Sequence, residues 1–291
     1  MKRILILGAS GTVGSAALKL LSQEKDLEIS GTYFSTLQKE ASSMIHFSVE
    51  FPNDIYSILE QARPDIVISC LRGDFDKQLA VHRGIADYLA PGDGKIIYVS
   101  TANVFDGSCE KPHYETDTPI SASAYGQFKI ECENLLRDRM GDRAIVLRIP
   151  FVWGKNSPRI EAVKAGCGSG RLEIYTDFYS NHVSDLQIAE MIRWIIREDK
   201  HGIFHIGTSD VVNYQQFMER LITATGMKKP ELTFLKEPGI MAVLSNRDDI
   251  PEQLKWNSER LIQYLAAVLW NGNRLETEAR WNRHCSAETE R

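Results

Sequence analysis

The stretch Ile4-Leu5-Ile6-Leu7-Gly8-Ala9-Ser10-Gly11-Thr12-Val13-Gly14-Ser15 decides the fold of this chain. Its four consecutive apolar residues, 4–7, predict a strand that is buried on both faces. Beyond the glycines, apolar residues recur at the spacing of a helix stripe, at Val13, Ala16, Ala17, Leu20 and Leu21. The glycines therefore stand where a buried strand gives way to a helix.

Glycines at such a turn have separate physical uses. Gly8 permits a tight turn, Gly11 lets a diphosphate approach bare backbone, and Gly14 lets the helix pack close to the strand. The first turn of the helix adds unpaired N–H groups and partial positive charge. An ordinary strand-to-helix turn is the alternative. The flanking strand and helix favour a dinucleotide site, with contacts from Gly8, Ser10, Gly11, Thr12, Val13 and Gly14.

Composition and charge narrow the class of protein. The 291 residues are 43% hydrophobic and 25% charged, and the net charge of -5 comes with no basic stripe, so we expect no nucleic-acid partner. No apolar run approaches the roughly 18 residues of a membrane span, and a signal-peptide pattern is lacking, so we expect a cytoplasmic protein without membrane contact. The cysteines are dispersed without a C-x-x-C pair, which predicts reduced thiols and no metal site.

Strand-like and helix-like segments alternate along the first half of the chain. Predicted strands at 4–7, 27–33, 44–49, 66–68, 95–99 and 144–149 are separated by helical segments. This alternation is typical of an α/β protein with a doubly wound parallel sheet, which we assign to residues 1–150, with 183–207 returning to it. Residues 151–182 and 208–291 then form a smaller, discontinuous α/β substrate lobe, in which 230–254 reads as irregular and 271–291 as frayed.

The end of the second predicted strand bears on which dinucleotide binds. An acidic residue there favours NAD, and its absence admits the 2′-phosphate of NADP. The segment Gly31-Thr32-Tyr33-Phe34-Ser35-Thr36 has no acid and is followed by Lys39, so NADP is favoured, with contacts from Phe34 and Ser35. NAD stays open, because a plain loop with no influence on the cofactor explains the same residues.

Further cofactor contacts are expected after the later strands, since ligands of parallel sheets lie beyond the carboxyl ends of the strands. Glu50 is placed to accept a hydrogen bond from the adenine amino group, although a solvated loop acid fits equally well. The backbone of Cys70, Leu71 and Arg72 is expected to pass near the cofactor. The Arg72 side chain either reaches a phosphate or lies on the surface.

Three residues suited to proton transfer follow at the same edge of the sheet. Thr101 stands just past the strand at 95–99, and Tyr125 and Lys129 form a Tyr-x-x-x-Lys pair on a predicted helix. Residues i and i+4 share a helix face, and a neighbouring ammonium lowers the pKa of a phenol from its usual value of about 10. We therefore predict that Tyr125 transfers the proton, that Thr101 aims the substrate oxygen, and that Lys129 also holds the nicotinamide ribose. The bare Tyr-x-x-x-Lys pair also fits a surface helix with a half-buried tyrosine.

In combination these motifs resemble the extended short-chain dehydrogenase/reductases. The segments 99–107 (Val-Ser-Thr-Ala-Asn-Val-Phe-Asp-Gly), 112–119 and 146–154 are similar to those of dTDP-4-dehydrorhamnose reductases and of the methionine adenosyltransferase regulatory beta subunit. The likeness runs through about residue 210. It implies a Rossmann core, a nicotinamide cofactor and a pocket for a nucleotide sugar.

Two segments that carry the resemblance supply the last predicted contacts. Pro150 and Val152 are expected beside the nicotinamide. Trp153 is expected to stack on a base or sugar, with core packing as the alternative, and Phe105 is a second expected substrate contact.

The chain also departs from the relatives that it resembles. His82 stands where many relatives have an asparagine that helps to organise a proton relay, and we expect it to be a histidine without such a role. Residues 176–185 replace a stretch that contacts the sugar nucleotide in the reductases. The identity of the sugar and of the nucleotide therefore stays open.

The function that these observations indicate is NAD(P)-dependent reduction of a keto group on a nucleotide-linked deoxysugar. One alternative is an NADP-binding regulatory subunit, and another is a nucleotide-sugar epimerase. Ala102 and Asn103 follow Thr101 where dehydratases usually have acids, which argues against dehydration. The sequence leaves the oligomeric state open, a homodimer included.

Overall fold

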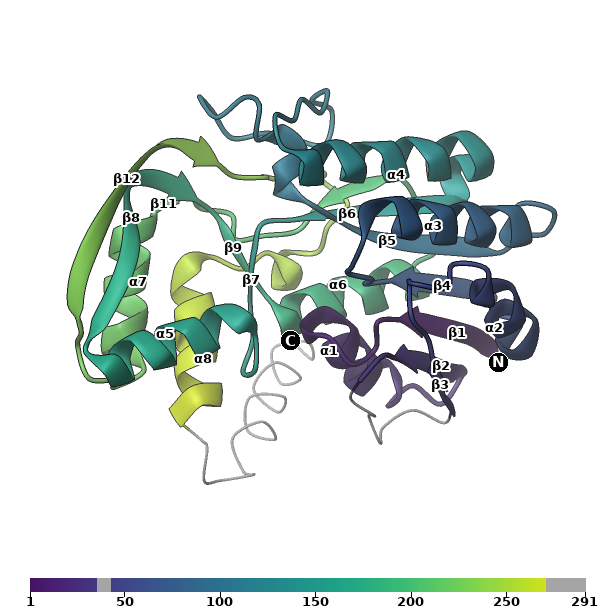
Figure 1. Cartoon of the computed structure of the whole chain (residues 1–291), viewed down its shortest axis with the longest axis horizontal. Helices are drawn as coiled ribbons and strands as arrows, with labels where there is room; N and C mark the ends of the chain where they lie inside the picture. The colour runs from purple at the N-terminus through teal and green to yellow at the C-terminus, as the bar shows by residue number, and fades with distance from the viewer. Residues whose placement is uncertain (36–42, 271–291) are drawn as a thin grey trace.

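A seven-stranded sheet organises the larger part of the molecule (Figure 1). The computed structural model describes residues 1–35 and 43–270. The strands are β1 (Lys2–Leu7), β2 (Leu27–Tyr33), β3 (Ser43–His46), β4 (Ile66–Ser69), β5 (Lys95–Thr101), β6 (Ala144–Ile149) and β10 (Ile203–His205). Their order is β10-β6-β5-β4-β1-β2-β3, and every neighbouring pair is parallel, which confirms the predicted doubly wound sheet.

Helices cover both faces of this sheet. One face carries α1 (Thr12–Leu21) and α6 (Asp185–Arg197), and the other carries α2 (Asp54–Ala62), α3 (Phe75–Leu89) and α4 (Ala124–Met140) (Figure 1). Each face has its own apolar cluster, because residues of a strand point alternately to opposite sides of the sheet. Short 3-10 helices at Ala102–Phe105, Gly141–Arg143 and Glu252–Leu254 occupy connections.

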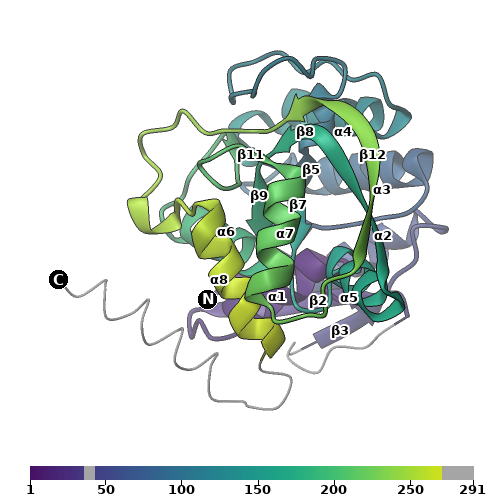
Figure 2. The same ribbon diagram turned by 90° about the vertical axis from the view of Figure 1, so that its left-hand side faces the viewer.

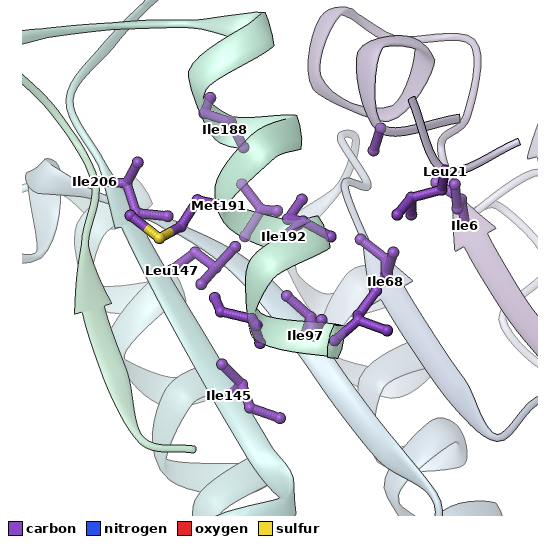
Figure 3. Packing of buried hydrophobic residues seen from close by; sticks show 14 of the residues in the cluster. Ile6, Leu21, Ile68, Ile97, Ile145, Leu147, Ile188, Met191, Ile192 and Ile206 are labelled. Carbon is purple, nitrogen blue, oxygen red and sulfur yellow. The ribbon is translucent and has the colours of Figure 1, made fainter. Parts of the chain in front are cut away.

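The packing of α6 shows why residues 183–207 return to the main sheet. Figure 3 shows Ile188, Met191 and Ile192 of α6 directed at the strands, where Leu147 and Ile97 are among their partners in one buried cluster. These α6 residues recur at helical spacing and are at most 2% exposed. The chain then enters β10, which extends the sheet beside β6.

A second, smaller sheet lies beside the first (Figure 2). It has the order β11-β8-β12, formed by β8 (Arg171–Ser180), β11 (Val212–Asn213) and β12 (Glu231–Met241). The helices α5 (Pro158–Ser169), α7 (Tyr214–Ala224) and α8 (Ser258–Trp270) share an apolar cluster with it. Two short strands connect the two parts of the molecule and pair with each other in parallel. The chain leaves the main sheet through β7 (Phe151–Trp153) and returns toward it through β9 (His182–Ser184).

The expectation that residues 230–254 are irregular is wrong for their first half. Glu231–Met241 forms the long strand β12, which pairs in parallel with β8. The alternation of polar and apolar residues at 231–234 breaks at Leu235 and a proline follows at 238, which makes a long strand hard to recognise here. Residues 231–238 are exposed except for a half-buried Leu232. Its pairing comes from β8, about sixty residues earlier in the chain, as in Glu231↔Arg171. The expected fraying at 271–291 lies outside the described residues.

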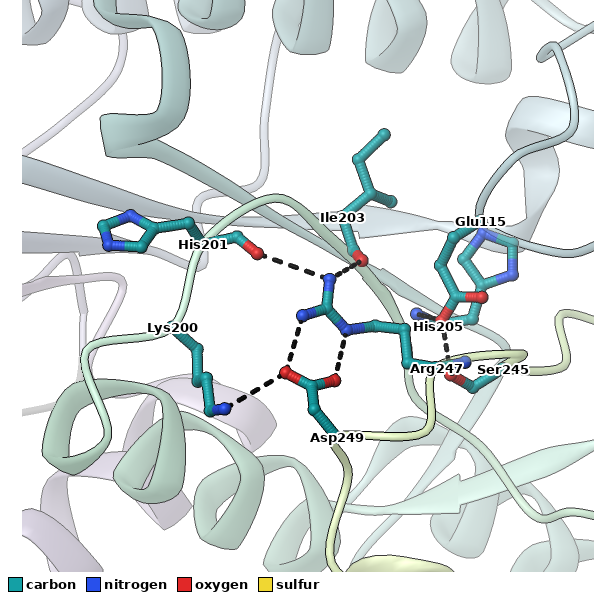
Figure 4. A network of polar contacts seen from close by, with 8 residues as sticks. All are labelled: Glu115, Lys200, His201, Ile203, His205, Ser245, Arg247 and Asp249. Carbon is teal, nitrogen blue, oxygen red and sulfur yellow. Dashed lines mark hydrogen bonds and ion pairs between the residues drawn. The ribbon is translucent and has the colours of Figure 1, made fainter.

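A polar network fastens the following segment to the main sheet (Figure 4). Arg247 forms a two-bond ion pair with Asp249, at 2.9 Å for each bond, and also donates to the Ile203 carbonyl at 3.3 Å. Glu115 accepts from the His205 N–H at 3.0 Å and from the Ser245 hydroxyl. Through these bonds, the chain between β12 and α8 crosses β10 in a defined path.

Within residues 1–35 and 43–270, the helices are too short or too polar to span a bilayer.

Candidate active site

A cleft of about 990 Å³ opens at the carboxyl ends of the main-sheet strands. Its wall on the side of the main sheet comes from the glycine turn after β1 and from residues that follow β2, β4, β5 and β6. Its other wall includes Phe151, Asn156 and Arg159, where the chain passes into α5, together with Met241 at the end of β12. This is the edge at which ligands of such sheets are expected.

The glycine turn has the backbone that a dinucleotide site requires. Gly8 has a φ of +75°, and a Cβ on it would lie 2.9 Å from the Cys70 carbonyl oxygen. A Cβ on Gly14 would lie 2.2 Å from the Gly8 carbonyl oxygen, so α1 packs directly on the turn. Gly11 is the N-cap of α1 and supplies no side-chain cap, which leaves the first-turn N–H groups of the helix open toward the cleft. These features fit a bound diphosphate.

A threonine, which the sequence analysis passed over, locks this turn to the neighbouring strand. The Thr32 hydroxyl of β2 accepts a hydrogen bond from the Gly8 N–H at 2.9 Å, and the Thr32 carbonyl accepts one from the Ala9 N–H, also at 2.9 Å. Thr32 is 1% exposed. Its position in β2, directly opposite the glycine turn, is the signal by which it could have been found.

Most residues predicted to contact the cofactor line this cleft. Ser35 is not among the lining residues, although Phe34 is, and Lys39 lies outside the described residues. Glu50 forms an ion pair with Lys77, at the rim. The predicted residues that line the cleft are Gly8, Ser10, Gly11, Thr12, Val13, Gly14, Phe34, Glu50, Cys70, Leu71, Arg72, Tyr125, Lys129, Pro150 and Val152.

The start of α4 brings Tyr125 to the end of β5. The Ser123 hydroxyl caps the helix by accepting from the Gly126 N–H at 3.1 Å. A Cβ on Gly126 would lie 2.2 Å from the Asn103 carbonyl oxygen, so only glycine allows the helix to approach the chain after β5 this closely. As a result, Tyr125 and Thr101 line the same part of the cleft, and the Thr101 hydroxyl donates to Asn103 Oδ1 at 3.0 Å.

Lys129 lies one helical turn further, beneath the tyrosine. Its ammonium donates to the Val99 carbonyl at 3.1 Å and lies 4.7 Å from the centre of the Tyr98 ring. It is 5.8 Å from the centre of the Tyr125 ring. Burial lowers the pKa of Lys129 to about 8. Thr101, Tyr125 and Lys129 therefore lie together in the cleft.

The acidity of Tyr125 differs from the expectation. Partial burial raises the pKa of its hydroxyl above the usual value, against the hydrogen bond from Thr101 and the positive charge of Arg72. Arg72, which lines the cleft, is thus a further cation near this phenol, which the sequence analysis did not connect with Tyr125. At neutral pH the Tyr125 hydroxyl therefore keeps its proton.

Two predicted substrate contacts do not reach the cleft. Trp153 is fully buried, donates to His182 Nδ1 at 3.1 Å and packs against Phe217 in the smaller part of the molecule. Phe105 is 3% exposed, and its ring stacks on His113 at 4.3 Å between centres. The chain turns away from the cleft at both places, so the contacts expected of these residues are not available in this structure.

Arg159 is a functional candidate that the sequence analysis missed. It lies in the first turn of α5, its Cζ is 4.0 Å from the centre of the Phe151 ring, and its charge acts on the nearby Tyr214. Burial lowers the pKa of Arg159, and the charge of Arg72 acts in the same direction. The signal available was Ser157-Pro158, which marks a helix start at the edge of the cleft.

His82 lies behind the cleft. Its Nε2 pairs with the Ser69 hydroxyl at 2.8 Å, and its Nδ1 with the Gln78 carbonyl at 2.6 Å. Burial, followed by the charge of Lys129, lowers the pKa of His82 to about 3, so it is neutral at physiological pH.

The fold and the site together define an NAD(P)-dependent oxidoreductase of the extended short-chain dehydrogenase/reductase class. The chain belongs to the family described as RmlD substrate binding domain, whose model matches residues 76–243.

Individual proteins are similar to this chain in sequence or in fold. The chain is 28% identical over 240 residues to a dTDP-4-dehydrorhamnose reductase of Aggregatibacter actinomycetemcomitans, covering 75% of this chain and 77% of that protein. It is 27% identical over 239 residues to methionine adenosyltransferase 2 subunit beta of Bos taurus, covering 74% and 70%. A dTDP-4-dehydrorhamnose reductase from Bacillus anthracis str. Ames, crystallised in complex with NADP, has the same fold, with a TM-score of 0.73 at 17% identity over 91% of this chain and 98% of that one.

Proposed function

We propose that this protein reduces a keto group on a nucleotide-linked deoxysugar with NAD(P)H, in the manner of the dTDP-4-dehydrorhamnose reductases. The observation that carries the proposal is that Thr101, Tyr125 and Lys129 line the same cleft as the glycine turn, with the Lys129 ammonium 5.8 Å from the centre of the Tyr125 ring. A proton donor and a site for the hydride donor thereby share one cavity.

Each of the three residues has a defined task in this reaction. When bound, the nicotinamide supplies a hydride to the carbonyl carbon. Tyr125 donates its proton to the carbonyl oxygen, so that hydride and proton together convert the ketone into an alcohol. Thr101, which lines the cleft with Tyr125, holds that oxygen beside the phenol. The Lys129 ammonium stabilises the phenolate that remains and is placed to bind ribose hydroxyls.

NADP is the favoured cofactor. Residues 31–35, at the end of β2, contain no carboxylate to pair with the ribose hydroxyls of NAD or to repel a 2′-phosphate. The reductase from Bacillus anthracis str. Ames crystallised with NADP is consistent with this choice. NAD remains the alternative, and a fluorescence titration of both reduced cofactors decides between them.

The cations of the cleft favour an anionic substrate. Arg159 lies on the wall opposite the glycine turn and is held by Phe151 and Tyr214. An arginine fixed in this way suits the diphosphate of a nucleotide sugar, because its planar fork binds two phosphate oxygens at once. Asn156, three residues earlier, adds a polar group to the same wall.

The deciding experiment is a panel of 4-keto nucleotide sugars, each assayed for oxidation of NADPH and NADH. The dTDP-linked 4-keto-6-deoxysugars are expected to be consumed with equimolar oxidation of the cofactor. Simple ketones without a nucleotide serve as the control. Oxidation that is equally fast with these ketones would contradict the nucleotide-sugar assignment.

A second function is favoured by the relatives named as methionine adenosyltransferase 2 subunit beta. In that case the cleft binds the dinucleotide, and the protein acts as a regulatory subunit. Tight NADPH binding with no turnover across the whole sugar panel would support this alternative over the reductase. Turnover of any member would exclude it as the sole function.

A further inference from the structure

Three consecutive residues of β5 lie against three points along one face of α4. The Val99 carbonyl accepts from the Lys129 ammonium at 3.1 Å, and Thr101 lines the cleft together with Tyr125. Between them, the Ser100 hydroxyl donates to Glu133 Oε1. Because Tyr125, Lys129 and Glu133 follow one another at intervals of four residues, they share a helix face. Glu133 thus extends the row formed by the proton donor and the amine.

Glu133 is held from the far side by a buried cation. Arg148 of β6 donates to Glu133 through Nη2 at 2.7 Å and through Nε at 3.2 Å, and both side chains are at most 3% exposed. Arg148 is also the register partner of Ser100 across the β5–β6 ladder. Two adjacent strands therefore fix the position of one carboxylate.

Stability alone does not explain why a buried ion pair of this kind is present. Removing two charges from water costs about as much as their attraction returns, and apolar replacements are often at least as stable. The local packing is apolar enough to accept them, since Leu136 and Cys132 on the same helix are fully buried. The carboxylate, however, lies one helical turn from Lys129.

We propose that Glu133, anchored by Ser100 and Arg148, is a positioning residue that keeps the Lys129 amine protonated and directed into the cleft. The inference rests on the proposed function, in which Lys129 acts as an ammonium. A neutral amine carries no positive charge and would not stabilise the phenolate in this largely buried site.

The other groups that face the Lys129 amine do not supply this charge. Burial lowers the pKa of Lys129, and Arg72 adds to that effect, whereas Glu133 opposes both. Burial raises the pKa of the Cys70 and Cys132 thiols to about 12 and about 11, so both are neutral at physiological pH. The facing groups, from α4 and from the elements packed against it, are Cys70, Arg72, His82, Tyr98, Tyr125, Cys132 and Glu133.

The test measures the titration of the Lys129 amine directly. Competitive labelling with acetic anhydride between pH 6 and 10, read by mass spectrometry, gives the pKa of this one amine in the whole protein. The double variant Glu133→Gln/Arg148→Met removes the pair without leaving a buried charge alone. Its Lys129 titration is expected to move down by about half a pH unit or more. The pH at which NADPH affinity has fallen halfway is expected to move down as well.

Two further variants make the result interpretable. Asp87→Asn/Arg139→Met removes an exposed ion pair between α3 and the same helix α4, and is expected to titrate as the wild type. Ser100→Ala loosens Glu133 while keeping its charge, and is expected to shift the Lys129 titration in the same direction by a smaller amount.

An unchanged Lys129 titration in the folded double variant would overturn the proposal, as would an equal shift in the control on the exposed pair. If the double variant fails to fold, an unchanged titration in Ser100→Ala overturns it. The labelling needs neither substrate nor cofactor. Absence of reductase turnover in the wild type would therefore count against the proposed function and leave this result readable.

Discussion

Replacing Gly14 by alanine puts a methyl group at the contact between α1 and the glycine turn. The new Cβ would lie 2.2 Å from the Gly8 carbonyl oxygen and 2.9 Å from Ala9 Cα, which are both backbone atoms. Ordinary contact begins at 3.4 Å, so the helix and the turn must separate by about 1.2 Å. No flexible side chain is available to absorb that movement.

The displacement acts on the backbone groups that bind the diphosphate. A misplacement of about 1 Å at such a site typically costs on the order of 100-fold, and overpacking of this kind costs about 1–3 kcal/mol of stability. We therefore expect Gly14→Ala to weaken NADPH binding by about 100-fold and to lower the free energy of unfolding within that range.

Fluorescence titration with NADPH and urea unfolding measure the two effects separately. Gly92→Ala is the matched control, because a Cβ on Gly92 meets nothing within 4 Å. A Gly14→Ala variant with the affinity of the wild type would refute the assignment of this turn as the diphosphate site, whatever its stability.

The remaining predictions concern three side chains. Tyr125→Phe should lower kcat by about 100- to 10,000-fold with little change in NADPH affinity, and turnover near the wild-type rate would remove Tyr125 as the proton donor. Arg159→Met should raise KM for the nucleotide sugar more than tenfold and leave cofactor titrations unchanged; an equal loss of cofactor affinity would speak against a substrate role. Asp185 is buried, and its pKa is raised to about 6. The unfolded chain therefore releases this proton at lower pH than the folded one, and stability should fall as pH rises from about 4 to about 6. Asp185→Asn keeps an acceptor for the Tyr264 hydroxyl and should abolish that loss, gaining about 2–3 kcal/mol at pH 7 in urea unfolding; an unchanged pH profile would contradict the raised pKa.

Local patterns predicted most of the larger sheet. The strand bounds 27–33 and 144–149 agree with the structure, because apolar runs depend on neighbouring residues only. β12 escaped prediction because its strand conformation depends on pairing with β8. The same reason explains Trp153, whose burial follows from contacts with His182 and Phe217 rather than from its neighbours in sequence.

The amino-acid sequence by itself determined the glycine turn, the order of strands and helices, and the four-residue spacing that puts Tyr125 and Lys129 on one face of α4. These features follow from steric freedom at glycine and from helix and strand periodicity, which act over a few residues. Only the tertiary structure decided that Arg72 lies in the cleft with Tyr125, that Arg159 enters the cleft, and that Glu133 meets Arg148. Charge, burial and hydrogen bonding depend on distances between segments far apart in the chain, and folding alone sets those distances.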